Sequence, residues 1–508
     1  MSRFIPHAVS PDRSATDSSL LDGMSYATEK PQVFNSLQGW LAIGSLILIT
    51  VLGIAGGAGK VLNVLFPTWS LIVAIFLYFR HPILYNGFVW WMWFLVAFIR
   101  RIVDFRSGYT EASPILLAPY LVSFVSIITV FKRIGNVRED GSLPFLLPLY
   151  ATFYGLLVGL ISKSAFVVFR GFLDWASPLF FAFHLFVNWK LYPQHRRNTQ
   201  QVFLWGILVM STYAVMQFIE LPEWDLIWLK ETGMESATGS AKEGGVRVWG
   251  TMHSPEPFAA VVSGGLLVLL SCAGGLGVPV SVIGYLAILV CRVRSGWLGW
   301  AAGLLSFFGA LKIKSQIRLV VIAAILIACV TPLMAMPEFS DKIGSRLDTF
   351  SNLENDSSAS GRQDTFNEVI GRALVSVVGE GLGRESMDNS ILSMLFYIGW
   401  IGTIPYLAGL VISLVQMFQT PTSSKDLFAT VSRGVVMSTI VRIPVNGPHL
   451  GPSGAMMWGF MALALAAERY RVHEANIKLI EEENYLAQLE ADTAVEESPL
   501  NPYWRKSL

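Results

Sequence analysis

Apolar residues gather in long runs along this chain, and short polar stretches separate the runs. A helix needs about 20 consecutive, mainly apolar residues to cross the hydrocarbon core of a bilayer. Counting such runs predicts about fourteen membrane-spanning helices. The expected spans are 38–58, 61–79, 83–99, 113–131, 143–162, 165–188, 200–219, 254–273, 276–291, 295–310, 317–336, 389–419, 428–444 and 450–467. We therefore expect an all-α polytopic membrane protein whose transmembrane domain is formed by residues 37–467.

Lysine and arginine clusters predict which side of the membrane each loop occupies, because short cytoplasmic loops carry an excess of these residues. Three clusters fall in one set of short loops, which we assign to the cytoplasm together with both chain ends: Lys132/Arg133/Arg138, Lys190/Arg196/Arg197 and Lys312/Lys314/Arg318. One further cluster, Arg100/Arg101/Arg106, falls on the opposite side. Either 83–99 is not a span, or these arginines serve a purpose on the outer face.

This arrangement leaves two long loops, 220–253 and 337–388, on the outer (periplasmic) side, and long insertions of this kind often carry function. We expect each loop to carry a surface helix. In the first loop, Trp224, Ile227 and Trp228 have helical spacing and suit the lipid headgroup region. In the second loop, residues 360–363 form a capping box that opens a helix with one apolar face.

Two tails flank the transmembrane domain. Residues 1–36 are polar and rich in serine and aspartate, which predicts a disordered cytoplasmic tail without a cleaved signal peptide. Residues 468–508 form a charged segment, which predicts a cytoplasmic helical tail with a solvated surface.

The composition agrees with the membrane class and excludes others. Hydrophobic residues make up 53% of the chain and charged residues only 14%, whereas soluble proteins have about 25% charged residues. The 37 Lys+Arg balance 36 Asp+Glu, so the basic excess of a nucleic-acid binder is absent. Cys272, Cys291 and Cys329 lie in apolar runs without metal-ligand spacing, so we expect neither a disulfide scaffold nor a metal site.

Several arginines stand at or beside the predicted spans on the outer face: Arg247, Arg292, Arg294, Arg362 and Arg384. A single arginine there is most simply explained by snorkelling or by a structural ion pair. A set of them on one face instead indicates a receptor for an anionic headgroup, because the guanidinium fork binds phosphate in a bidentate manner. Both outer loops are net acidic, so these arginines indicate specific sites rather than a general basic patch.

Some of these segments resemble motifs of the O-antigen ligase/polymerase family. Arg247…Gly250-Thr251…Pro255, which precedes an apolar helix, resembles the family's Arg…Gly-Thr-Phe…Pro element. Arg294-Ser295-Gly296-Trp297-Leu298-Gly299 resembles its Ser-Arg-Ser/Thr-Gly-(aromatic)-Leu element. The last outer loop and its return helix are matched by Arg362…Phe366, Gly379…Gly381 and Asp388-Asn389…Leu392 through Gly399-Trp400-Ile401-Gly402. The matching region covers about residues 240–410, less than half of the chain.

The resemblance implies a metal-independent membrane glycosyltransferase that uses no cofactor and acts at the periplasmic face of the bacterial inner membrane. Such an enzyme transfers a glycan from an undecaprenyl-diphosphate carrier to an acceptor glycan, among membrane lipids and with a chain-length regulator as a further partner. Arginines would then neutralise the leaving diphosphate. Arg247, Arg294 and Arg362 match the family's arginine positions, whereas Arg292 and Arg384 are supported by their placement alone.

A base is also needed to accept the proton of the acceptor hydroxyl. The family's ligases commonly have a histidine before the return helix, where this sequence has Asp388. Asp388 is therefore our candidate base, although an Asp-Asn pair before an apolar run equally predicts a helix N-cap. His253, Glu256 and Asn389 are secondary candidates, and His449 is expected to be structural because it lies in a tight turn.

The missing histidine favours a polymerase that joins repeat units of an O-antigen, capsule or exopolysaccharide. Two alternatives stay open: a ligase that transfers the glycan to lipid A core or protein, and a transporter of bicarbonate or another small anion, whose arginines would line the anion path. Arg170, His184 and Arg442 lie within predicted spans, where each should have a buried partner.

Overall fold

The computed structural model describes residues 36–234, 238–272, 274–311, 313–334, 370–383, 389–419 and 426–496. Within these ranges the chain forms α-helices and short 3-10 helices, without any strand. Eight of the described helical segments are long and apolar enough to cross a membrane, and three shorter apolar helices accompany them. The protein is thus an α-helical, multi-pass membrane protein, which agrees with the apolar runs of the sequence.

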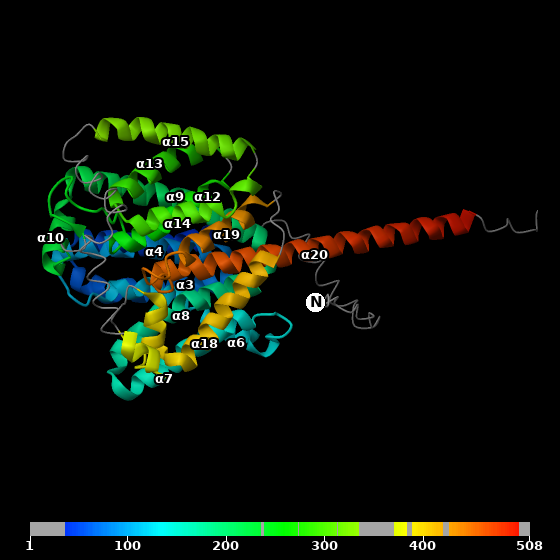
Figure 1. The fold of residues 1–508 in the computed structure, drawn as a ribbon, viewed down its shortest axis with the longest axis horizontal. Coiled ribbons are helices and arrows are strands. Elements are labelled where there is room, and N and C mark those ends of the chain that lie inside the picture. The colour runs from blue at the N-terminus through cyan, green and yellow to red at the C-terminus, as the bar shows by residue number, and fades with distance from the viewer. Residues whose placement is uncertain are drawn as a thin grey trace, which may run out of the picture.

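The first half of the chain contributes α2 (Ser36–Ala55), α3 (Gly59–Arg80), α4 (Pro82–Ser107), η2 (Pro114–Leu117), α5 (Ala118–Phe124), α6 (Ile127–Arg133), η3 (Ile134–Asn136), α7 (Leu143–Ser162), α8 (Ala165–Val187), η4 (Trp189–Leu191) and α9 (Tyr192–Glu220). The second half contributes α10 (Glu223–Thr232), α12 (Pro255–Leu269), α13 (Gly277–Cys291), α14 (Arg294–Leu305), η5 (Phe308–Ala310), α15 (Ile313–Met334), α18 (Ser390–Gln419), α19 (Leu427–Ile440) and α20 (Gly451–Glu496). These helices run back and forth and pack into one bundle, from which the last part of α20 projects alone (Figure 1).

Contacts between distant segments define two ends of this bundle. At one end, the Arg101 side chain near the end of α4 donates a hydrogen bond to the Gly250 carbonyl oxygen, just before α12 begins. We call this the Gly250 end, and α10 lies there too (Figure 1). At the opposite end, the Tyr192 hydroxyl at the start of α9 donates to Asp426, which caps the start of α19.

Aromatic side chains form much of the interior of the bundle. The Trp90 ring on α4 lies 5.5 Å from Phe181 on α8 and 5.0 Å from Phe203 on α9, between ring centroids. Phe460 on α20 lies 5.3 Å from Phe203. These edge-to-face contacts connect four helices at the centre, because large rings bury much apolar area and prefer this geometry.

The three basic clusters that predict the cytoplasmic side lie at the end of the bundle opposite to Gly250. This holds for those of their residues that the structure describes. Arg133 forms an ion pair with Asp140, and Arg196 forms one with Asp426. Arg318 donates a hydrogen bond to the carbonyl oxygen of Cys272, which follows the far end of α12. The described arginines of these three clusters therefore lie at the end of the bundle away from Gly250.

Several boundaries differ from the predicted spans. The helix predicted over 83–99 continues as α4 to Ser107, so Arg100 and Arg101 belong to a true helix. The predicted span 113–131 is divided among η2, α5 and α6. The last predicted span and the following tail form one helix, α20, because no glycine or proline interrupts the chain between Gly459 and Glu496.

The return helix α18 is interrupted at Gly399, whose φ of 57° and ψ of −170° are not helical. The segment around Gly379 lies against this interruption, and the backbone N–H of Gly381 donates to the Tyr397 carbonyl oxygen. In return, the N–H of Trp400 donates to Ser376 and the N–H of Ile401 donates to Val377. The backbone groups that the interruption frees are thus bonded within the protein, as burial in a membrane requires.

Candidate functional site

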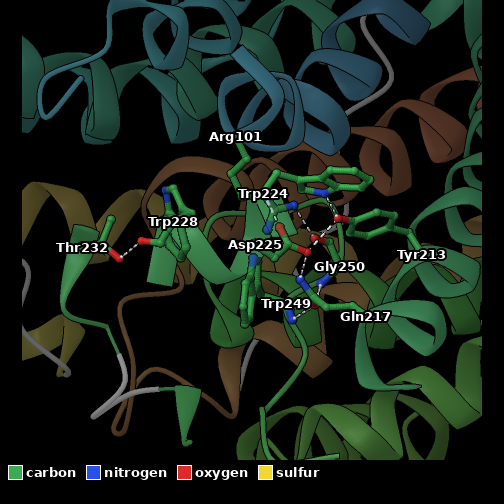
Figure 2. A network of polar contacts seen from close by, with 9 residues as sticks. All are labelled: Arg101, Tyr213, Gln217, Trp224, Asp225, Trp228, Thr232, Trp249 and Gly250. Atoms are coloured by element: carbon green, nitrogen blue, oxygen red, sulfur yellow. Dashed lines mark hydrogen bonds and ion pairs between the residues drawn. The ribbon is translucent and has the colours of Figure 1, made fainter. Parts of the chain in front are cut away.

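The loop before α12 is held by a buried polar network (Figure 2). Asp225 on α10 is 0% exposed and forms an ion pair with Arg101, which is 1% exposed, at 3.2 Å. Tyr213 and Gln217 on α9 each donate a hydrogen bond of 2.7 Å to the same Asp225 oxygen. Gln217 also accepts a hydrogen bond of 3.0 Å from the backbone N–H of Gly250. The network therefore fixes the position of the Gly250 loop relative to α4, α9 and α10.

The Gly250-Thr251 motif fits this loop for steric reasons. Gly250 has a φ of 54°, and a Cβ atom added there would lie 2.5 Å from the Phe258 ring. The Thr251 hydroxyl donates a hydrogen bond of 2.6 Å to the Phe94 carbonyl oxygen on α4. Only glycine adopts this backbone conformation without strain in so tight a space.

Of the three arginines that disagree with the positive-inside pattern, Arg100 and Arg101 are held in buried ion pairs, whereas Arg106 is exposed. Arg100 forms an ion pair of 3.1 Å with Asp104 and donates hydrogen bonds to the carbonyl oxygens of Thr110 and Glu111. Arg101 is paired with Asp225 as described above. Both side chains are buried and neutralised, so they do not add to the exposed positive charge that governs orientation.

Two of the three residues in the apolar stripe of α10, Trp224 and Trp228, pack against the protein. Trp228 is buried, and its ring lies 5.7 Å from that of Trp249. Trp224 packs against Phe105 and donates a hydrogen bond to Tyr213, which leaves Ile227 as the exposed member of the stripe. Helical spacing indicates an apolar face, but it does not say whether lipid or protein covers that face.

Glu256 occupies the centre of a second polar cluster at the Gly250 end. It forms an ion pair with Arg442, whose side chain is 1% exposed, while Glu256 itself is 36% exposed. Asn446 donates hydrogen bonds of 3.0 Å both to Glu256 and to the Ser295 hydroxyl. The starts of α12 and α14 are thereby tied to the turn between α19 and α20, and Glu256 is the partner that the sequence requires for Arg442.

Asn389 and Ser390 connect the start of α18 to the same turn. The Asn389 side chain accepts a hydrogen bond of 3.0 Å from the backbone N–H of Leu392 and donates one to the Pro444 carbonyl oxygen. Asn389 therefore fills the N-cap position for which Asp388 is the alternative candidate. The Ser390 hydroxyl and His449 Nδ1 share a hydrogen bond of 2.9 Å. This bond gives His449 the structural role that its place in a tight turn predicts.

The remaining described arginine candidates are Arg294, Arg292 and Arg247. Arg294 is the first residue of α14, directly before Ser295, and is partly buried. Arg292 has a φ of 57° and donates a hydrogen bond of 2.9 Å to the Gly245 carbonyl oxygen. Arg247 is partly buried in the loop two residues further on, where its backbone N–H donates to Thr238. All three lie at the Gly250 end.

A recess of about 380 Å³ lies at the Gly250 end, between residues of α4, α8 and α10, and His253 lines it. Its ring packs against the Trp228 ring, with 5.3 Å between the ring centroids. Desolvation inside the recess, and then the positive charges of Arg100, Arg101 and Arg170, lower the pKa of His253 to about 4. His253 is therefore neutral near pH 7.

Arg170, which also lines the recess, has the carboxylate partner that a charge within a span requires. It interacts electrostatically with Asp174, one turn further along α8, and Asp174 accepts a hydrogen bond from Tyr120. The sequence interpretation overlooked Asp174. The signal was the i, i+4 spacing of Arg170 and Asp174 within an apolar run. His184 instead bonds to Thr129 at 2.7 Å, in the half of α8 away from the recess.

The structure thus bonds Glu256 and Ser295 through Asn446, and Asn389 bonds to Pro444 in the same turn. Arg294 lies directly before Ser295, and His253 lines the recess. Arg362, Arg384 and Asp388 lie outside the described residues. Among the described side chains, no group of three or more His, Cys, Asp or Glu residues could hold a metal ion.

No family model matches this chain, and no curated protein matches its sequence. The arrangement of the Gly250 end is therefore the basis for a functional assignment.

Proposed function

We propose that this protein is a glycan polymerase of the bacterial inner membrane, which transfers repeat units from an undecaprenyl-diphosphate carrier to an acceptor glycan. About fourteen helical segments would cross the bilayer, with the short helices α12, α13, α14 and α19 among them. The Gly250 end would face the periplasm, because the basic loops gather at the other end.

One observation carries this proposal. The described segments that resemble family motifs, 247–255, 294–299 and 389–402, each begin or end at the Gly250 end, although more than 130 residues lie between the first and the last of them. Hydrogen bonds through Asn446 and Pro444 join the second and third of these segments to one turn. Guanidinium groups at the place where a diphosphate leaves would stabilise the charge that develops on it.

The chemistry would proceed by direct displacement. The acceptor hydroxyl oxygen forms a bond to the anomeric carbon of the donor, and the bond from that carbon to the diphosphate oxygen breaks. Arg294 and Arg292, with Arg247 nearby, would neutralise the charge that develops on the diphosphate. Asp388 would accept the hydroxyl proton. The capping bond of Asn389 supports this role, because the start of α18 does not require the Asp388 carboxylate.

A second candidate, transport of a small anion, draws on Arg170 and Asp174. Charged residues within a span commonly mark an ion pathway. Arg170 interacts with Asp174, however, and α18 is bonded across its interruption at Gly399 by the segment around Gly379. Binding sites in transporters more often lie at interrupted helices whose freed backbone groups face the ligand.

The proposal is tested with purified protein in nanodiscs and a fluorescent undecaprenyl-diphosphate oligosaccharide as both donor and acceptor. A ladder of longer lipid-linked products is the expected result. Transfer only after lipid A core or a protein acceptor is added would make the protein a ligase. Folded protein that transfers to no acceptor but moves bicarbonate into vesicles would contradict the enzyme proposal and favour the transporter.

A further inference from the structure

The recess beside Arg170 contains more polar groups than the proposed transfer chemistry uses. It is lined by Arg100, Tyr109, Glu111, Ser113, Leu116, Arg170, Glu231, Thr232, Met234 and His253. Its volume of about 380 Å³ lies within the range of about 300–1,000 Å³ that is usual for small-molecule sites.

The charges around the recess balance. Two arginines, Arg100 and Arg170, face two glutamates, Glu111 and Glu231. His253 adds no charge near pH 7, because its pKa is lowered to about 4. Asp104 and Asp174 also interact with these two arginines, so the recess has no positive excess and offers little attraction for a free anion.

Some of these side chains already bond to other residues of the protein, whereas others form no ion pair with any described residue. Arg100 is bonded to Asp104, Thr110 and Glu111, so its role is to hold the wall of the recess. Glu111 and Glu231 are exposed, and within the part of the chain that the structure describes neither side chain forms an ion pair. Tyr109 is half-buried, with the Arg100 guanidinium 5.5 Å from its ring centroid.

Carboxylates that only accept hydrogen bonds, a guanidinium that only donates them, and a neutral imidazole that does both form a complementary set for hydroxyl groups. An aromatic ring beside them provides an apolar face for the C–H face of a sugar ring. We infer that the recess is the binding subsite for the terminal sugar units of the acceptor glycan, a neutral polyhydroxylated ligand.

This inference rests on the proposed function and adds to it a place for the acceptor. His253 lies two residues before α12, and Glu256 lies in the first turn of that helix. A glycan seated in the recess would therefore end beside the cluster of Glu256, Ser295 and Arg294. The donor diphosphate would occupy the arginines of that cluster, so the two substrates meet without sharing a site.

The test uses wild-type protein in nanodiscs and the soluble repeat-unit oligosaccharide released by mild acid from the lipid-linked donor. Saturation-transfer NMR should detect binding of this oligosaccharide, and inorganic phosphate at equal concentration should not displace it. Glu231→Gln and Tyr109→Leu should each weaken binding by roughly tenfold, the effect expected for one strong contact. Glu223→Gln, on the same helix α10 but outside the recess, is the matched control and should bind like the wild type.

Displacement by phosphate would show an anion site and overturn the inference. The inference would also be overturned if Glu231→Gln and Tyr109→Leu bound the oligosaccharide as tightly as the control variant while retaining the wild-type melting temperature.

The elongation assay distinguishes failure of the acceptor subsite from failure of the polymerase proposal. If the wild type makes a ladder while both variants keep the wild-type KM for the acceptor, the subsite is wrong and the polymerase stands. If the oligosaccharide binds in the recess but no ladder forms with any donor, the polymerase is wrong.

Discussion

At the scale of single residues, Asp225 determines where the Gly250 loop lies. Its carboxylate joins Arg101 to Tyr213 and Gln217, and the last of these holds the backbone of the loop. A buried charge that loses its partner is costly because no water replaces the lost interaction. The position of the candidate site therefore depends on a carboxylate outside it.

Replacing Asp225 with asparagine should lower the free energy of unfolding by about 3–5 kcal/mol, since Arg101 would keep its charge in a buried place. The exposed pair Arg372–Glu380 provides the control, and Glu380→Gln should change stability by about 1 kcal/mol or less. Denaturant unfolding in detergent compares the two variants. Equal losses would contradict the assignment of Asp225 as the support of the loop.

His253 should make stability depend on pH in a defined window. The folded protein keeps His253 neutral down to about pH 4, whereas the unfolded chain protonates it below its usual value of 6.5. The unfolded state therefore binds more protons between these values, so stability falls as the pH is lowered from 6.5 to about 4. In His253→Gln the melting temperature should fall less over this window, and parallel curves for variant and wild type would refute the assignment.

The candidate residues were predictable from sequence to the extent that their neighbours in the chain identify them. Arg294 and Glu256 could be selected because each stands where an apolar run begins. Asp174 could be selected as the partner of Arg170 from its i, i+4 spacing, but its connection to Tyr120 on α5 could not be predicted, because it depends on how two helices pack. Asn389 and Asp388 form equivalent cap signals in the sequence, and the structure shows that the Asn389 side chain accepts the N–H of Leu392.

At the scale of helices, unbroken spans were predicted well and interruptions were not. The predicted span 143–162 coincides with α7, and 165–188 differs from α8 by one residue, because polar residues border both runs. The interruption of α18 at Gly399 leaves no gap in the apolar run, since the segment around Gly379 supplies the missing bonds from elsewhere in the chain. Hydropathy reports burial in the membrane, but not backbone conformation.

Gly399→Ala tests this account of α18. A Cβ atom there would lie 2.4 Å from the Val377 carbonyl oxygen, and its φ of 57° is unfavourable for alanine. We expect a loss of about 1–3 kcal/mol from backbone strain alone, measured as a lower unfolding midpoint. Gly44→Ala in α2 is the matched control, because no atom lies within 4 Å of the added Cβ and alanine favours helix. A similar midpoint for both variants would mean that α18 is not interrupted in the membrane.

At the scale of the whole molecule, the orientation of the bundle connects the fold to the proposed function. In intact cells, Glu231→Cys on α10 should react with a membrane-impermeant maleimide added outside the inner membrane, whereas Leu479→Cys on α20 should react only after lysis. Both positions are exposed, and the native Cys272 and Cys291 are buried, so the wild type serves as the background control. The reverse pattern would place the Gly250 end in the cytoplasm, away from any periplasmic substrate.

The most direct measurement of the central claim is the single-turnover rate of glycan transfer by Arg294→Lys. Lysine keeps the positive charge but replaces a bidentate fork with a point charge, so we expect a rate lower by about 10²-fold with donor binding largely retained. Arg197→Lys, exposed near the start of α9 at the opposite end, is the control and should react at the wild-type rate. A full rate for Arg294→Lys would contradict the claim that the arginines of the Gly250 end bind the leaving diphosphate.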